Sequence, residues 1–304
     1  MSLVFPGGVW PVMLTPFTVN NEVDYEALDQ LITWYIKEGV SGLFAVTQSS
    51  EMFYLSGKES EDIARFVVEK AAGRVPVIAS GHVADDLREQ ADSIIRMGST
   101  GVDAVILITN RLADQTESDE VWLDRMQWLL KQIPEHIRLG LYECPYPYKR
   151  ILSAEVTKWC AHTGRFYFLK DTSCDMESIR KKLEVMKGTN LQLYNANSAT
   201  LLESLKAGAV GYSGVMANMQ CRLYVELCRR YREERMRNLE EELTMCALIE
   251  RQLYPVNAKY YLRQEGIPIT TKCRAKDDSE LTETYKLEMR MLRNITERME
   301  CEYL

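Results

Sequence analysis

The chain has 304 residues, a formal net charge of −7 and a pI of about 5.3, and 46% of its residues are hydrophobic. Such a chain can bury a large core, and its interspersed charges argue against a nucleic-acid-binding surface. No apolar run approaches the roughly 18 residues that a membrane span needs. The first residues show no export signal, so a soluble, cytoplasmic protein is expected.

The eight cysteines and three histidines are dispersed along the chain. No two cysteines have the C-x-x-C spacing, and the histidines do not cluster as metal ligands would. We therefore predict reduced thiols and no metal site. His82 follows an expected strand, and we interpret it as a loop residue without an assigned function.

Eight short runs with strand character recur along the chain, separated by amphipathic helical patterns such as 25–38, 59–72, 87–97 and 120–131. The runs read GVWPVML, GLFAV, VPVIASG, DAVILIT, RLGLYEC, FYFLKDT, LQLYNAN and AVGYSGV. Strands that alternate with helices form parallel β-α-β units, and eight such units predict a closed (β/α)8 TIM barrel. The first run also lacks the G-x-G-x-x-G loop of an open dinucleotide-binding sheet.

Local signals mark where several helices begin and end. Asp24 precedes the first helical pattern, and Ser56 with Glu59 forms a capping box before the second. Glycine ends helices at low cost because it adopts the left-handed conformation easily. The glycines expected in this role are Gly39, Gly73, Gly98, Gly164, Gly188 and Gly208.

The last part of the chain differs from the rest, because its pattern is helical and heavily charged. We expect the barrel to occupy residues 1–220 and a helical extension to occupy residues 221–304. Apolar positions within the extension, including Leu239 and Leu243, predict a side packed on the barrel or on a neighbouring subunit. No flexible linker separates the two parts, so they are expected to form one structural unit.

Side chains at the carboxyl ends of barrel strands are candidates for the active site, because the β-α loops converge there. Lys170 follows the apolar run 166–169, and Tyr142 lies at the end of the preceding strand. Burial lowers the pKa of a lysine and frees its amine to attack a ketone, and a neighbouring tyrosine can transfer protons. The residues alone leave open a lysine that extends to solvent and a tyrosine used for packing.

Two of these strand ends, LKDTS and YECP, carry a family resemblance. With GVWPVMLTPFTVNNEVDYEAL, GVSGLFAVTQSSEMFYLSGKE and AVGYSGVMANM, they resemble the dihydrodipicolinate synthase/N-acetylneuraminate lyase family of class I pyruvate aldolases. The resemblance implies that Lys170 is the Schiff-base lysine of a K-D/E-T/S context. It also implies that Tyr142 is the proton-transferring tyrosine of a Y-N-x-P motif, in which Glu143 replaces asparagine.

The same resemblance implies that the loop 47–51, which reads TQSSE, binds the substrate carboxylate. The family loop reads G-T/S/G-T/S-G-E, so both glycines are replaced here, and the backbone loses the freedom that glycine gives. Turn amides and hydroxyls suit an anion. The predicted substrate-binding residues are Ser49, Gln48, Ser50, Ser213 and Asn195, and Glu51 is interpreted as a supporting residue.

Two departures argue against true dihydrodipicolinate synthesis. The P-Y-Y-N motif of the synthases is absent after the fourth strand, and Pro147 occupies the position of their carboxylate-binding arginine. A bidentate arginine is not replaced without cost by another nearby cation. A different second substrate is therefore expected, recognised by residues such as Lys149, Arg150, Arg111 or Asn195.

The resemblance thus implies a Schiff-base-forming lyase that acts on pyruvate, 4-hydroxy-2-oxo acids or sugar-acid analogues through Lys170. It implies no metal and no organic cofactor, a 2-oxo acid and an aldehyde as small-molecule partners, and a homotetramer built as a dimer of dimers. Two alternatives stay open: a sugar-acid dehydratase that uses the same imine, and a barrel that binds a 2-oxo acid without turnover.

Overall fold

The computed structural model describes residues 4–304, and within them eight parallel strands form one sheet in the order β1-β8-β7-β6-β5-β4-β3-β2. The strands are β1 (Gly8–Val9), β2 (Leu43–Phe44), β3 (Val77–Ala79), β4 (Ala104–Ile108), β5 (Leu139–Tyr142), β6 (Phe166–Asp171), β7 (Gln192–Asn195) and β8 (Gly211–Tyr212). Ser41 N donates to Val9 O at 2.8 Å and Phe44 N to Pro11 O at 3.1 Å. These bonds join the two ends of the sheet, so the predicted (β/α)8 barrel is confirmed.

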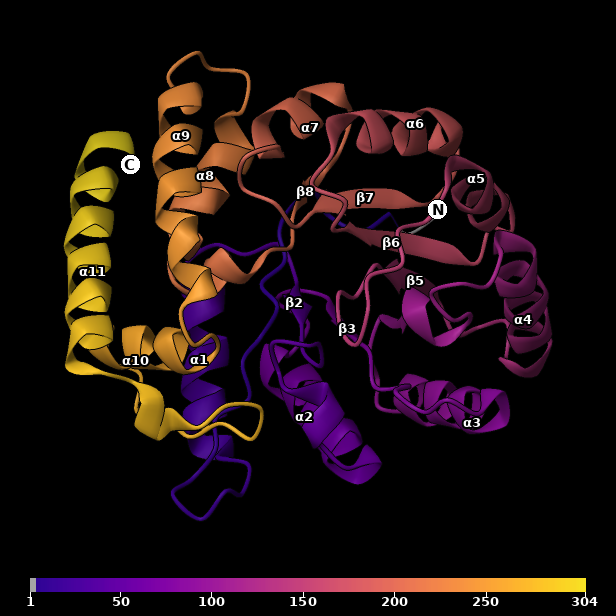
Figure 1. Ribbon diagram of the computed structural model, residues 1–304, viewed down its shortest axis with the longest axis horizontal. Helices are drawn as coiled ribbons and strands as arrows, with labels where there is room; N and C mark the ends of the chain where they lie inside the picture. The colour runs from indigo at the N-terminus through magenta and orange to yellow at the C-terminus, as the bar shows by residue number, and fades with distance from the viewer. Residues whose placement is uncertain (1–3) are drawn as a thin grey trace.

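A helix follows each strand and covers the outside of the barrel (Figure 1). These helices are α1 (Tyr25–Lys37), α2 (Gly57–Ala71), α3 (Leu87–Gly98), α4 (Asp119–Gln132), α5 (Ala154–His162), α6 (Met176–Met186), α7 (Leu201–Ala207) and α8 (Cys221–Arg230). Asp24 caps α1 by accepting from Ala27 N, and Ser56 and Glu59 form the predicted capping box of α2. The strand and helix patterns of the sequence therefore lie where they were expected.

Gly98 is the exception among the predicted helix-ending glycines. It is the last residue of α3, and Gly101 takes the left-handed conformation instead, with a φ of 94°. A Cβ atom at Gly98 would lie 2.8 Å from Ile137 Cδ1. The absence of a side chain there serves close packing of α3 and not a change of backbone direction.

Aromatic side chains fill the barrel below the carboxyl ends of its strands. The rings of Phe168 and Tyr194 stack with centroids 4.0 Å apart, and Trp10 and Phe44 pack edge-on against Phe168. Residues two apart on a strand face the same side, so Phe168 and Lys170 both point into the barrel. Lys170 therefore stands on an apolar floor.

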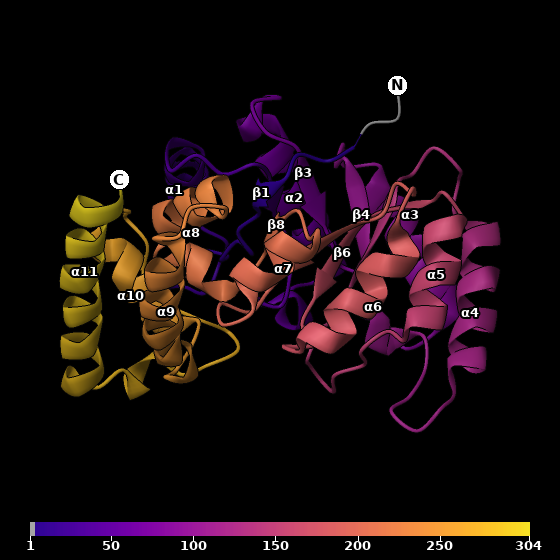
Figure 2. The same cartoon turned by 90° about the horizontal axis from the view of Figure 1, so that it is seen from above.

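Three more helices extend the chain beyond the barrel: α9 (Met236–Cys246), α10 (Val256–Gln264) and α11 (Glu283–Tyr303). They lie together on one side of the barrel in both views, with α11 outermost (Figures 1 and 2). The boundary expected at residue 220 falls before α8, which packs against β1 and β8 as a helix of the barrel. Among residues 4–304, no helix has the length and apolar character to cross a membrane.

Candidate active site

Lys170 and Tyr142 are register partners on the neighbouring strands β6 and β5. Both side chains are buried, and Lys170 Nζ lies 4.3 Å from the centre of the Tyr142 ring. Burial lowers the pKa of Lys170 to about 7, although Cys144 and Glu250 act weakly in the opposite direction. A substantial fraction of the amine is therefore uncharged and nucleophilic at neutral pH.

A cavity of about 380 Å³ opens at the carboxyl ends of the strands, where barrel active sites lie. Lys170 and Tyr142 line it, together with Gln48 and Ser49 of the TQSSE loop and Thr172 after β6. The structure thus brings the predicted amine, phenol and carboxylate-binding hydroxyl around one space. Such a space suits a small molecule with a carbonyl group beside a carboxylate.

Tyr142 is held in its protonated form next to a buried thiol. Burial raises its pKa well above the ordinary value, and interaction with Cys144 adds to this rise. The Cys144 Sγ also contacts Gln48 Oε1 at 3.5 Å and Tyr146 O at 3.4 Å. Cys144 therefore connects the phenol to the TQSSE loop. The sequence predicted only that Cys144 is a reduced thiol, and it did not predict this contact.

The TQSSE loop keeps a compact shape without glycine. Ser50 Oγ accepts from Thr47 N at 2.7 Å and lies 2.9 Å from both Met13 O and Ala45 O. The side chain of Ser50 is therefore fixed inside the loop and does not line the cavity. Ser49 N donates to Thr47 Oγ1 at 3.0 Å, and Ser49 lines the cavity.

Ser213 and Asn195 also lie outside the cavity lining. Ser213 Oγ donates to Trp10 O at 2.9 Å and ties β8 to the first strand region. Asn195 Nδ2 donates to Thr200 Oγ1 and Ser204 Oγ, at 2.9 and 3.1 Å. Of the five predicted substrate-binding residues, Gln48 and Ser49 line the cavity. The side chains of the other three form hydrogen bonds to neighbouring parts of the barrel.

The cations considered for the second substrate are engaged elsewhere. Lys149 Nζ donates to Thr172 O at 2.8 Å, Arg150 pairs with Asp119, and Arg111 pairs with Asp85. None of the three belongs to the cavity lining found within residues 4–304. They therefore do not form the expected cation site for a second substrate carboxylate.

His82 lies in the loop after β3, as expected, but its side chain is buried. It is 1% exposed, and its Nε2 accepts a hydrogen bond from Ile108 N at 3.1 Å. Burial lowers its pKa to about 3, with a smaller effect from Arg111, so the ring is neutral. Among residues 4–304 no group of three or more histidine, cysteine or acidic side chains is placed to hold a metal ion.

The chain after the barrel supplies a wall of the cavity that the sequence did not reveal. Glu250 lies in the short 3₁₀ helix η4 (Ala247–Arg251), and Tyr254 and Lys276 come from the segments around α10. Tyr254 is neutral because burial raises its pKa, and its hydroxyl interacts with Ser49 and accepts from Asn218 Nδ2 at 2.9 Å. The only local sequence feature at this position is that Tyr254 directly precedes Pro255. A pair of residues is too short a motif to assign a role to the tyrosine.

Glu51 anchors this wall to the TQSSE loop. Its carboxylate accepts from Lys259 Nζ at 2.8 Å, and both side chains are completely buried. The other carboxylate oxygen accepts from the main-chain N–H groups of Arg274 and Ala275. A single acid thus holds α10 and the segment before Lys276 against the barrel mouth, in line with its interpretation as a supporting residue.

Comparisons with known proteins identify the family of the chain. The model of the Dihydrodipicolinate synthetase family matches residues 5–292. A 4-hydroxy-tetrahydrodipicolinate synthase of Nitratidesulfovibrio vulgaris is 26% identical over 274 residues, covering 87% of this chain and 86% of that protein. A synthase of the same name from a Jannaschia species is 29% identical over 219 residues, covering 72% and 73% of the two chains.

Solved structures show the same fold. A dihydrodipicolinate synthase of Bacillus anthracis superposes with a TM-score of 0.86 at 19% identity, covering 96% of this chain and 99% of that one. The chloride-inhibited synthase of Acinetobacter baumannii, solved with pyruvate, gives 0.85 at 21% identity with the same coverage. Because the family model spans almost the whole sequence, the chain belongs to the dihydrodipicolinate synthetase family.

Proposed function

We propose that the protein is a class I lyase in which Lys170 forms a Schiff base with pyruvate or a related 2-oxo acid. One observation carries this proposal: a buried lysine with a lowered pKa stands beside a protonated tyrosine in a cavity with a serine hydroxyl. Two family members, the synthase of Acinetobacter baumannii and a prophage protein of Escherichia coli, were solved with pyruvate.

In the proposed reaction, the Ser49 hydroxyl binds the substrate carboxylate, which places the 2-oxo carbon near Lys170, whereas the Thr47 and Ser49 amides donate within the loop. The Lys170 amine attacks that carbon, and Tyr142 donates a proton to the oxygen as the carbinolamine forms. Loss of water gives a protonated imine. This imine accepts electrons, so the protein needs neither a metal nor an organic cofactor for the next step.

Carbon–carbon cleavage then starts from a 4-hydroxy substrate. A base, proposed to be the Tyr142 phenolate formed in the first step, removes the proton of the 4-hydroxyl group. The C3–C4 bond breaks, an aldehyde leaves, and the electron pair of the bond forms an enamine with the imine carbon. Protonation of C3 and hydrolysis release pyruvate and regenerate Lys170.

The second substrate is proposed to be an aldehyde or sugar-acid fragment and not an aldehyde with a second carboxylate, which the resemblance implies for the synthases. Pro147 stands where those synthases place an arginine, and Arg111 and Arg150 pair with surface acids outside the cavity. A second carboxylate would therefore lack a bidentate partner. The homotetramer and the cytoplasmic location inferred from the sequence remain predictions.

Borohydride trapping tests the proposal. The protein is incubated with pyruvate and sodium borohydride, and its intact mass and the modified peptide are determined. We expect one reduced pyruvyl adduct per chain on Lys170 and none in Lys170→Ala. Absence of an adduct from folded wild-type protein with pyruvate and a panel of 2-oxo acids would overturn the proposal.

A further inference from the structure

Behind the catalytic pair lies a second set of polar side chains that the reaction does not use. Alternate residues of a strand face opposite sides, so Glu143 and Asp171 point out of the barrel where Tyr142 and Lys170 point in. Both carboxylates are completely buried between the sheet and the helix layer. Buried acids need a partner, because an unpaired charge in the interior is very costly.

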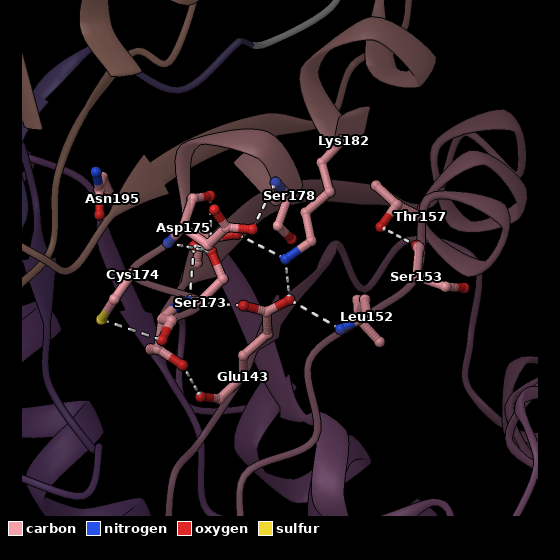
Figure 3. A network of polar contacts seen from close by, with 12 residues as sticks. Glu143, Leu152, Ser153, Thr157, Ser173, Cys174, Asp175, Ser178, Lys182 and Asn195 are labelled. Carbon is pink, nitrogen blue, oxygen red and sulfur yellow. Dashed lines mark hydrogen bonds and ion pairs between the residues drawn. The ribbon is translucent and has the colours of Figure 1, made fainter. Parts of the chain in front are cut away.

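Lys182 of α6 is that partner for both acids. Its Nζ lies 2.6 Å from Asp171 Oδ2 and also donates to Glu143 Oε1. The lysine side chain is 1% exposed, and Figure 3 shows it extending from its helix toward Glu143. One ammonium group therefore joins the ends of β5 and β6 from outside the barrel.

Main-chain groups complete the network and extend it to the cavity. The Glu143 carboxylate accepts from Leu152 N at 2.9 Å (Figure 3) and from Thr172 N at 3.0 Å. Thr172 Oγ1 in turn donates to Glu143 O at 2.6 Å, and Thr172 lines the cavity next to Lys170. The network therefore fixes the backbone on both sides of the catalytic pair.

The electrostatics show that Lys182 is charged. Burial alone would lower its pKa, but attraction by Glu143 and Asp171 outweighs burial and raises it. Burial raises the pKa of Glu143, which Lys182 partly offsets. Buried ion pairs of this kind often add little net stability compared with apolar packing, so stability alone is a weak reason for this network.

We propose that Lys182 is a positioning residue for the active site: by holding Glu143 and Asp171 together, it aligns Tyr142 and Lys170 on the same reacting carbon. The inference rests on the proposed function. Glu143 stands where the family motif has asparagine, and this exchange provides Lys182 with its second carboxylate. Alignment of this kind is worth much in catalysis, since a shift of about 1 Å can cost on the order of 100-fold in rate.

The test uses exchange of the C3 protons of pyruvate in deuterated water, followed by NMR. Exchange requires the imine, the enamine and a correctly placed proton donor, but it needs no aldehyde substrate. The rate is divided by the number of sites that borohydride traps, so partly unfolded protein does not count. Wild-type trapping tests the proposed function, and the rate per trapped site tests the role of Lys182.

Lys182→Met is compared with Lys181→Met, its neighbour on α6, which is 64% exposed and pairs with Glu177 on the surface. We expect Lys182→Met to lower the exchange rate per trapped site by about 10- to 100-fold and to change its pH profile. Lys181→Met is expected to keep the wild-type exchange rate per trapped site and the wild-type pH profile. A wild-type rate and pH profile in folded Lys182→Met would overturn the inference and leave the network a purely structural role.

Glu143→Gln decides the question if Lys182→Met does not fold. It keeps the size of the side chain and the pair between Lys182 and Asp171, but it removes one of the two charges that Lys182 joins. We expect a smaller but measurable loss, about 10-fold per trapped site. An unchanged rate and pH profile in this variant would likewise overturn the positioning role.

Discussion

Lys170 and Tyr142 face each other across the β5–β6 pair, with no residue of either strand between them. The barrel thereby places an amine and a phenol from separate strands side by side, above stacked aromatic rings. These rings help to bury the Lys170 amine, and burial lowers its pKa.

The rate of imine formation is expected to rise with pH up to about 7 and to level off above it. Below the pKa of Lys170, which is about 7, the amine is protonated and cannot attack. A lysine with an ordinary pKa of about 10.4 would show a rate that still rises tenfold per pH unit between pH 8 and 9. Initial rates of trapping with cyanoborohydride across pH 5.5–9 distinguish these two pH profiles. A rate that still rises tenfold per pH unit between pH 8 and 9 would contradict the prediction.

Tyr142→Phe keeps the aromatic ring and removes the proton donor. We expect it to lower C3 proton exchange of pyruvate by about 10²- to 10⁴-fold, the usual contribution of a general acid–base group. Tyr148→Phe is the control, because the Tyr148 hydroxyl donates to main-chain carbonyls of Asn110 and Ala113 outside the cavity. Equal losses in both variants would argue against a role for Tyr142 in proton transfer.

Ser49→Ala is expected to weaken pyruvate binding. Loss of a hydrogen bond to a carboxylate corresponds to about 1.5–3 kcal/mol, or roughly a 10- to 100-fold higher pyruvate concentration for half-maximal trapping. Ser213→Ala should leave this concentration unchanged, because the Ser213 hydroxyl donates to Trp10 O. The opposite order of the two variants would mean that the carboxylate binds near β8.

Lys259→Met removes the cation that pairs with buried Glu51. Glu51 would keep its two main-chain donors but lose its cation, and breaking a buried ion pair costs about 3–5 kcal/mol, so the free energy of unfolding in urea is expected to fall by that amount. Lys272→Met breaks a half-exposed pair with Asp278 and should cost less than about 1 kcal/mol. Similar losses in the two variants would show that Glu51 is not held as the structure indicates.

Local patterns were sufficient for the barrel. Apolar runs mark buried parallel strands, and the rule that barrel sites lie at strand ends makes Lys170 and Tyr142 candidates, whose roles only the family resemblance implies. Patterns do not tell where a short polar side chain points after a strand. For this reason Ser50, Ser213 and Asn195 were predicted together with Ser49. Their side chains instead form hydrogen bonds within the barrel and do not line the cavity.

Long-range contacts were beyond the reach of the sequence. Lys182 resembles the other charged residues of an amphipathic helix, and only the packing of α6 on β5 and β6 brings it to Glu143. Glu51 and Lys259 are 208 positions apart, and no local signal connects them. The wall that carries Tyr254 was missed for the same reason, because it reaches the cavity only through such contacts.

Because two separate stretches of the chain enclose the cavity, chemistry and selectivity can diverge independently in this protein. The strands hold the amine and the phenol, whereas the later stretch adds Glu250, Tyr254 and Lys276 to the lining of the cavity. If the proposed reaction holds, substitutions in this later stretch would admit a different aldehyde while the imine forms unchanged. Relatives that share the strand residues can therefore share the first half of the reaction and still differ in the compound they cleave or make.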